Sequence, residues 1–261
     1  MTPLHPRASR YGWIPDLPDH RDLRYALRRM PQEAPRKLPR KVDLSVAPMA
    51  APYEQGELGS CTANAIGAAF QFEHRQQSLG ELMPSRLFIY YGEREIEGSI
   101  QSDAGAMIRD GIKVVAAQGA PPEATWPYIL TQFATRPSAK AYKEALGHRA
   151  ISYFRLDNTR KEELLTCLAS GFPFIFGFTV YESFEGPEAS QHGVVNLPQE
   201  GERAIGGHAV LAVGYDMKTE RFLVRNSYGA DWGRKGYFTM PFAYLTNEDL
   251  AADFWTIRVV S

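Results

Sequence analysis

The chain changes character near residue 150, and this change constrains its fold more than any other feature of the sequence. Before that point apolar residues recur at helical spacing, as Ile108, Ile112 and Val115 do. Helices are predicted over 61–77, 84–97, 105–118 and 138–146. After that point, short runs rich in Val, Phe, Tyr and Ile are separated by Gly, Asp and Asn, which is typical of strands. This order favours an α+β protein with two lobes and a site in the cleft between them.

The overall composition excludes several classes of protein. The 261 residues are 44% hydrophobic with a mean hydropathy of -0.32, which indicates a globular chain. A net charge of -1 gives no reason to expect nucleic acid, and the chain has no apolar window of about 18 residues for a membrane span. The first ten residues lack the apolar core of a secretory signal. The compartment stays open: cytoplasmic, or exported by a route without a Sec signal.

Residues 1–41 form a separate segment that is basic and rich in proline. They hold ten Lys or Arg against four Asp or Glu, a net charge of +6, whereas the whole chain carries -1. Seven prolines exclude a long helix and predict an extended strap. We expect this strap to dock on the acidic remainder of the chain; a disordered basic tail is the alternative.

The two cysteines have different surroundings. Cys61 follows a loop of small residues and begins a predicted helix, where the unpaired N–H groups and the helix dipole favour a thiolate. The sequence therefore predicts a lowered thiol pKa and a reactive sulfur. Cys167 lies in an amphipathic helix that opens with Thr159 and Glu162 at capping-box spacing and stops at Gly171, so we interpret it as packing. The sequence contains no metal-binding or nucleotide-binding motif, and we expect no cofactor.

A nucleophilic thiol needs a base, and His208 is the candidate. It begins the run GGHAVLAVGYD, a predicted buried strand, and the turn-like segment DMKTE joins this strand to RFLVRNS. A hairpin folded about Met217 places position 208 opposite Asn226. An amide there accepts the imidazole N–H and orients the ring, so the sequence predicts a Cys-His-Asn set.

Three separated motifs in this chain resemble those of papain-like cysteine peptidases. QGELGSC is similar to the family signature Q-G-x-C-G-S-C-W, and GGHAVLAVGYD resembles the strand of the catalytic histidine. NSYGADWGRKGYF is close to N-S-W-G-x-x-W-G-x-x-G-Y-[FI]. The order Gln, Cys, His, Asn also matches. The resemblance covers roughly residues 42–261 and implies a papain-like two-lobed fold with a helical N-terminal lobe and an antiparallel, β-barrel-like C-terminal lobe.

The resemblance implies a role for each matching residue. Cys61 would be the nucleophile, His208 the base and later the acid, and Asn226 the residue that orients the imidazole. Gln55 would donate to the oxyanion together with the Cys61 backbone N–H. A Gly-Gly substrate-binding turn corresponds to Ala104 and Gly105, which would put Gly105 near the substrate backbone.

This chain also departs from the family pattern. Thr62 follows the nucleophile and Tyr228 follows the Asn-Ser pair, where the family has tryptophans, while Trp232 keeps its place with shielding or core packing as its role. We therefore expect a divergent, bacterial branch. Residues 1–41 would be a prosegment or a brace, and 42–261 the catalytic domain, with a helical lobe at about 55–150 and a β-rich lobe at about 151–261.

The resemblance predicts a cysteine-type endopeptidase, monomeric, that cleaves peptide or protein substrates through a covalent acyl-enzyme. Two alternatives stay open at this stage. An acyltransferase or amidase would use the same thiol and imidazole, and a papain-like binding module would use neither.

Overall fold

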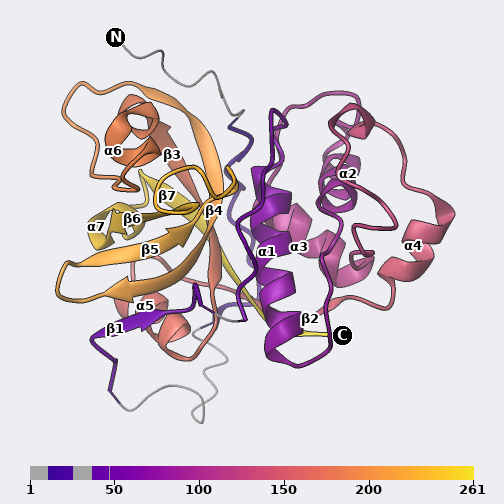
Figure 1. Cartoon of the computed structure of the whole chain (residues 1–261), viewed down its shortest axis with the longest axis horizontal. Coiled ribbons are helices and arrows are strands. Elements are labelled where there is room, and N and C mark those ends of the chain that lie inside the picture. Colours follow the sequence, from indigo (N-terminus) through magenta and orange to yellow (C-terminus); the bar gives the residue numbers. More distant parts are fainter. Residues whose placement is uncertain (1–10, 26–36, 47) are drawn as a thin grey trace.

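Helices gather on one side of the molecule and a β-sheet on the other (Figure 1). The computed structural model describes residues 11–25, 37–46 and 48–261. The helical side consists of α1 (Cys61–Gln76), α2 (Arg86–Glu97), α3 (Ile108–Ala117), the short 3₁₀ turn η2 (Leu130–Gln132) and α4 (Ala139–Ala145). Within these described ranges, every helix is too short or too polar to cross a membrane.

The sheet side is a single antiparallel sheet. Its strands are β1 (Lys41–Asp43), β2 (Ala150–Arg155), β3 (Phe174–Tyr181), β4 (Ala204–Asp216), β5 (Arg221–Arg225), β6 (Tyr237–Pro241) and β7 (Ala251–Val260). They run in the order β2-β7-β3-β4-β5-β6, and β1 pairs with β4. The shorter helical elements on this side are α5 (Lys161–Ala169), η3 (Glu182–Glu185), α6 (Pro187–Ser190) and α7 (Phe242–Leu245). The α+β prediction is confirmed, with a sheet that is open and not closed into a barrel.

Successive side chains of β3 point to opposite faces of the sheet and pack into two separate core clusters. Phe174, Phe176 and Phe178 belong to an aromatic cluster on one face, while Ile175 packs with the residues of α1 on the other. Burying a side chain of this kind contributes about 2 kcal/mol. Helix α1 is the centre of the second cluster because Ala, Gly and Cys on its surface allow β4 and β7 to approach closely.

The predicted helices of the first half are confirmed to within three residues at each end. Helix α5 starts differently from the prediction. Its N-cap is Arg160, which makes no side-chain capping bond, and the Thr159 hydroxyl donates to Asp157 instead. The capping box predicted for Thr159 and Glu162 is therefore wrong, because a local turn around Asp157 satisfies the threonine first.

The hairpin that carries the predicted base also has a different register from the one expected. Asp216 pairs with Arg221 and Leu211 with Arg225, with a bulge between Ala212 and Gly214. The hairpin therefore folds beyond Met217, and β5 ends before Asn226. A bulge adds an unpaired residue to one strand, and sequence patterns do not locate it.

Residues 11–25 run as an extended segment between the helical side and the sheet side, and we call this stretch the N-terminal segment. The Trp13 N–H donates to the Gly207 carbonyl on β4 at 3.0 Å. On the other side, the Ala106 N–H donates to the Gly12 carbonyl at 2.7 Å and the Ile14 N–H donates to the Ala106 carbonyl at 3.0 Å. The segment therefore has backbone hydrogen bonds to both sides of the molecule.

A buried ion cluster holds the other part of this segment. The Arg109 guanidinium lies 2.9 Å from Asp16 and 2.8 Å from Asp22, and Arg155 lies 2.8 Å from both Asp16 and Asp253. Three carboxylates face two guanidiniums, so the cluster carries one excess negative charge unless it holds a proton. Burial, and next the charge of Asp253, raises the pKa of Asp16 to about 7, and these effects outweigh the opposing effect of Arg155.

Candidate active site

The Cys61 sulfur lies where the first turn of α1 meets β4. The Ala209 N–H donates to the sulfur at 3.4 Å, and Ala209 directly follows His208 on the strand. The side chain of Cys61 is completely buried, and so is that of His208. The two residues predicted as nucleophile and base, 147 positions apart in the sequence, therefore share one enclosed space.

The His208 imidazole is oriented by the amide of Asn226. Its Nε2 lies 2.8 Å from the Asn226 Oδ1, which also accepts the backbone N–H of Ser227 at 2.8 Å. An oxygen that accepts both bonds requires the imidazole proton on Nε2. The lone pair then lies on Nδ1, which makes no hydrogen bond within the described part of the chain. This tautomer leaves Nδ1 ready to accept a proton.

Aromatic rings cover the histidine and its amide. The Tyr228 ring stacks on the His208 ring with centroids 4.9 Å apart and an angle of 26°. Trp232 meets Tyr228 edge-on at 5.7 Å. The tyrosine thus occupies the place where the sequence motif led us to expect a tryptophan, and it covers one face of the imidazole that is bonded to Asn226.

Gln55 is fixed by two neighbours. Its Nε2 donates to the Leu58 carbonyl at 2.9 Å, and its Oε1 accepts the Ser227 hydroxyl at 2.6 Å. Ser227 therefore joins the predicted oxyanion donor to the residue that follows Asn226. The NSYG motif contains this serine but gives no sign of its bond to Gln55.

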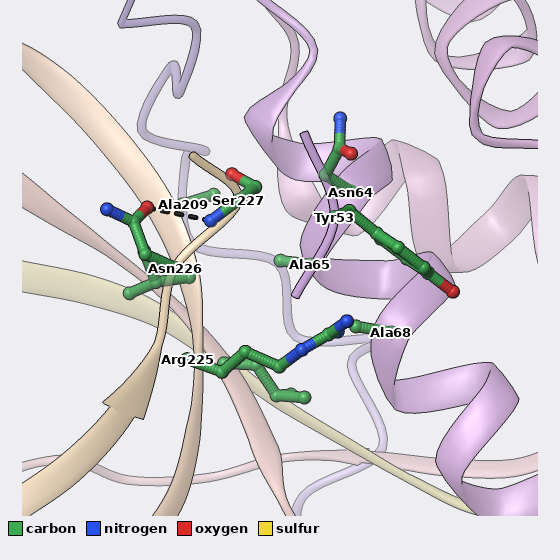
Figure 2. Close-up of a pocket in the computed structure, with 10 residues that line it drawn as sticks. Tyr53, Asn64, Ala65, Ala68, Ala209, Arg225, Asn226 and Ser227 are labelled. Carbon is green, nitrogen blue, oxygen red and sulfur yellow. Dashed lines mark hydrogen bonds between the residues drawn. The ribbon is translucent and has the colours of Figure 1, made fainter. Parts of the chain in front are cut away.

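A small cavity lies behind the Asn226 amide, between α1 and the strands β4 and β5. Figure 2 shows Asn226 and Arg225 on the sheet side of this cavity and Tyr53 and Asn64 on the helical side. The Arg225 guanidinium stacks on the Tyr53 ring at 4.5 Å. The lining mixes small apolar side chains, such as Ala65 and Ala68, with these polar groups, and it includes neither Cys61 nor His208, so we assign this cavity to the support of the amide.

Thr62 explains one departure from the family motif. Its hydroxyl donates to Glu93 at 2.8 Å, and Glu93 is completely buried beside the first turn of α1. Burial raises the pKa of this carboxyl well above its ordinary value. A tryptophan at position 62 would leave Glu93 without that donor, so the threonine and the glutamate form a unit that the sequence motif alone does not reveal.

Gly105 lies against the N-terminal segment, but the backbone hydrogen bonds to this segment are made by the next residue, Ala106. The Gly105 N–H donates to the Tyr90 hydroxyl at 3.3 Å, while Ala106 pairs with residues 12–14. A Cβ at Gly105 would lie 2.2 Å from the Gly12 carbonyl oxygen, and the φ of Gly105 is +85°. Glycine is required at this position because a backbone passes directly over it.

The backbone of Gly12 covers the thiol. Its N–H lies close enough to the Cys61 sulfur to oppose the rise in the pKa of the thiol, and a Cβ at Gly12 would lie only 1.8 Å from the Gly59 carbonyl oxygen. The Tyr11 ring contacts the His208 ring with centroids 6.0 Å apart. Residues of the N-terminal segment therefore fill the space that a substrate would need beside the sulfur and the imidazole.

Burial in this arrangement moves both titrating groups toward their neutral forms. It raises the pKa of Cys61 to about 11, although the N–H groups of Ala209 and Gly12 oppose the shift. It lowers the pKa of His208 to about 4, against the opposing effect of the hydrogen bond that His208 donates to Asn226. The expectation of a lowered thiol pKa is wrong for this arrangement, because the loss of water outweighs the N-terminus of the helix.

Comparison with known proteins places the fold and the family. A model of the papain family of cysteine proteases matches residues 38–247. The chain is 46% identical to an uncharacterized peptidase C1-like protein of Acanthamoeba polyphaga mimivirus, over 80% of this chain and 70% of that one. It is 26% identical to cathepsin L of Sarcophaga peregrina over 72% of this chain, and the match spans about half of that relative's length.

A solved structure agrees over nearly the whole chain. The crystal structure of xylellain, a cysteine protease from Xylella fastidiosa, superposes with a TM-score of 0.89 at 43% identity and covers 97% of both chains. The fold is therefore that of the papain-like hydrolases. The chain belongs to the papain family of cysteine proteases. The family resemblance seen in the motifs is confirmed, whereas the bacterial branch stays a prediction.

The covered thiol should alkylate slowly. With its pKa raised to about 11, Cys61 has roughly a hundredfold less thiolate at pH 7 than an ordinary cysteine, and Cys167 is buried as well. We expect iodoacetamide to label both residues at least tenfold more slowly in the native chain than in the chain unfolded in guanidinium. Mass spectrometry of timed digests measures both rates, and native labelling of Cys61 as fast as in the unfolded chain would contradict the burial.

Because of the ion cluster, the stability of the docked N-terminal segment should depend on pH. The pKa of Asp16 is about 7 when the segment is docked, compared with an ordinary value of 3.8. At pH values between these two, docking of the segment is therefore accompanied by proton uptake at Asp16. His208 has the opposite effect, because its lowered pKa makes the same step release a proton. The difference in the opening free energy of the segment between the native chain and Asp16→Asn isolates the contribution of Asp16.

We expect the advantage of the native chain over Asp16→Asn to fall as the pH rises from about 4 to about 7 and to be level above that. Hydrogen exchange of the Trp13 and Ile14 amides, corrected for the intrinsic rate, gives the opening free energy of the segment in both proteins. A difference that does not change with pH would show that Asp16 takes up no proton.

Proposed function

We propose that this chain is an endopeptidase in which Cys61, His208, Asn226 and Gln55 hydrolyse peptide bonds. One observation supports this most strongly: the Cys61 sulfur contacts the residue next to His208, whose Nε2 is held by Asn226 at 2.8 Å. A thiol, a base and an orienting amide are the three groups that nucleophilic acyl transfer requires.

In the proposed mechanism the thiol proton moves to Nδ1 of His208 and the sulfur attacks the carbonyl carbon of the peptide. The oxyanion is stabilised by the Cys61 backbone N–H and by the second N–H of Gln55, the first being bonded to Leu58. One such donor is typically worth about 10²–10³ in rate. His208 then protonates the leaving amine, and water releases the acyl group from the sulfur while His208 accepts its proton.

We further infer that residues 1–41 form an inhibitory extension of a catalytic domain at 42–261, and that the described part of it keeps the enzyme latent. The Gly12 N–H is the group that acts on the sulfur, and the Gly12 carbonyl accepts the Ala106 N–H at 2.7 Å, so the segment offers no carbonyl carbon for attack there. Removal of the segment would also return water to Cys61 and His208, which weakens the burial that holds both groups neutral. A brace that only joins the two sides is the competing account.

Peptide or protein substrates follow from the family and from the relatives named as cathepsins and cysteine proteinases. An acyltransferase or amidase would need the same residues, and no contact among the described residues favours it. The presence of both the thiol and the imidazole argues against a catalytically silent module.

Replacing Gly12 with alanine should activate the full-length chain. The added Cβ would lie 1.8 Å from the Gly59 carbonyl oxygen, so the segment cannot stay in place over the sulfur. We expect Gly12→Ala to raise the hydrolysis of a fluorogenic peptide library at least tenfold. A lower melting temperature without a gain in activity would support the brace.

The activity of that variant should depend completely on the sulfur. We expect Cys61→Ala in the Gly12→Ala background to lose at least 10³-fold in kcat/KM, since no other group can form the acyl-enzyme. Cys167→Ala in the same background is the matched control and should keep the activity. Equal rates with and without the Cys61 thiol would end the proposed mechanism.

A further inference from the structure

Trp13 is inserted in a flat slot between β3, β4 and the helical side. The indole is 7% exposed, and Gly177 and Gly207, on the same face of the paired strands β3 and β4, form the sheet wall of the slot. A Cβ at Gly177 would lie 2.0 Å from the indole Cε2, and one at Gly207 would lie 2.8 Å from Cε3. Two neighbouring strands that both lack a side chain here leave a space with the thickness of an aromatic ring.

A buried carboxylate forms the floor of this slot. Asp253 on β7 is 2% exposed, and its Oδ2 accepts the Trp13 Nε1–H at 3.0 Å and the Asp16 N–H at 2.9 Å. Its other oxygen accepts from Arg155 at 2.8 Å. The φ of Asp253 is +59°, a conformation uncommon for residues other than glycine, and it belongs to the residue that receives the indole.

The slot opens beside the sulfur. The backbone of Gly12, the residue adjacent to Trp13, lies close to the Cys61 thiol, and the Trp13 N–H is bonded to the Gly207 carbonyl next to His208. A side chain that enters the slot therefore belongs to a peptide residue close to the bond that is cut.

The charges that remain without the N-terminal segment decide which side chains fit. Asp253 loses both donors to its Oδ2, while Arg109 and Arg155 lose Asp16 and Asp22. Two guanidiniums and one carboxylate are left, with a net charge of +1. The floor then needs a neutral hydrogen-bond donor, because a lysine or arginine side chain would enter a positively charged neighbourhood.

We propose that this slot is a specificity pocket of the active enzyme and that it selects peptides with a tryptophan within two residues of the bond that is cut. The inference rests on the proposed peptidase function. Tryptophan combines a flat ring with an N–H donor, phenylalanine has only the ring, and arginine has a charge of the wrong sign. A hydrogen bond to a charged group makes a difference of about tenfold or more.

The test uses the full-length Gly12→Ala chain and two sets of fluorogenic peptides, with the varied residue first or second before the scissile bond. We expect kcat/KM for tryptophan to exceed that for phenylalanine by about tenfold in one set, with arginine below phenylalanine. Asp253→Asn keeps the size of the floor but replaces one acceptor oxygen with an amide, and it should bring the ratio of tryptophan to phenylalanine close to one.

A second variant is independent of the Asp253 ion pair. Gly177→Ala puts a methyl group where the indole lies, 2.0 Å from Cε2, and should lower kcat/KM for tryptophan at least tenfold more than for alanine at the same position. Gly147→Ala is the matched control, because its Cβ would meet only the Glu144 carbonyl oxygen at 3.5 Å. A preference for arginine would contradict the proposed specificity pocket. So would a selectivity for tryptophan, measured as the ratio of kcat/KM values, that neither variant changes.

The experiments distinguish a wrong prediction of tryptophan specificity from a wrong prediction of peptidase activity. If Gly12→Ala hydrolyses no peptide, the proposed function fails, and protection of Cys61 from iodoacetamide still measures the slot. N-acetyl-tryptophanyl-glycinamide should then protect at about tenfold lower concentration than the phenylalanine compound. Equal protection by both compounds contradicts the inference.

Discussion

The close approach of β4 to the first turn of α1 determines the geometry of the whole site. The N–H of Ala209 reaches the Cys61 sulfur at 3.4 Å, and this is feasible because the residues that face one another there have small side chains. A larger residue on either surface would separate the sulfur from the strand that carries His208. The packing of this contact therefore decides whether a thiol and an imidazole 147 residues apart can act together.

The same close packing has an electrostatic consequence. Neutral thiol and neutral imidazole are the favoured forms while the N-terminal segment excludes water, and the reactive ion pair needs solvent or a polar substrate beside it. Reactivity in this protein is therefore a property of what covers the sulfur as well as of the residues around it. The helix N-terminus alone does not make the thiol acidic.

Much of the site was predictable from the sequence, because Gln55, Cys61, His208 and Asn226 lie in motifs with characteristic neighbours. Helical periodicity and strand composition also gave the correct fold class. Asp253 and Trp13 carry no such signal: their contact joins residues 240 positions apart, and the left-handed backbone of Asp253 has no sequence marker. The bulge in β4 was invisible for the same reason, since it depends on how two strands twist against each other.

The attachments of the N-terminal segment bear on how the proposed latency would end. Residues 11–25 are held by backbone bonds and the ion cluster, while Lys41 to Asp43 pair independently with the far end of β4. A single break in the chain between these two anchors would leave every contact over the sulfur intact. If the segment inhibits as proposed, the severed piece would behave as a reversible inhibitor in trans, and the fraction of working enzyme would depend on dilution as much as on cleavage.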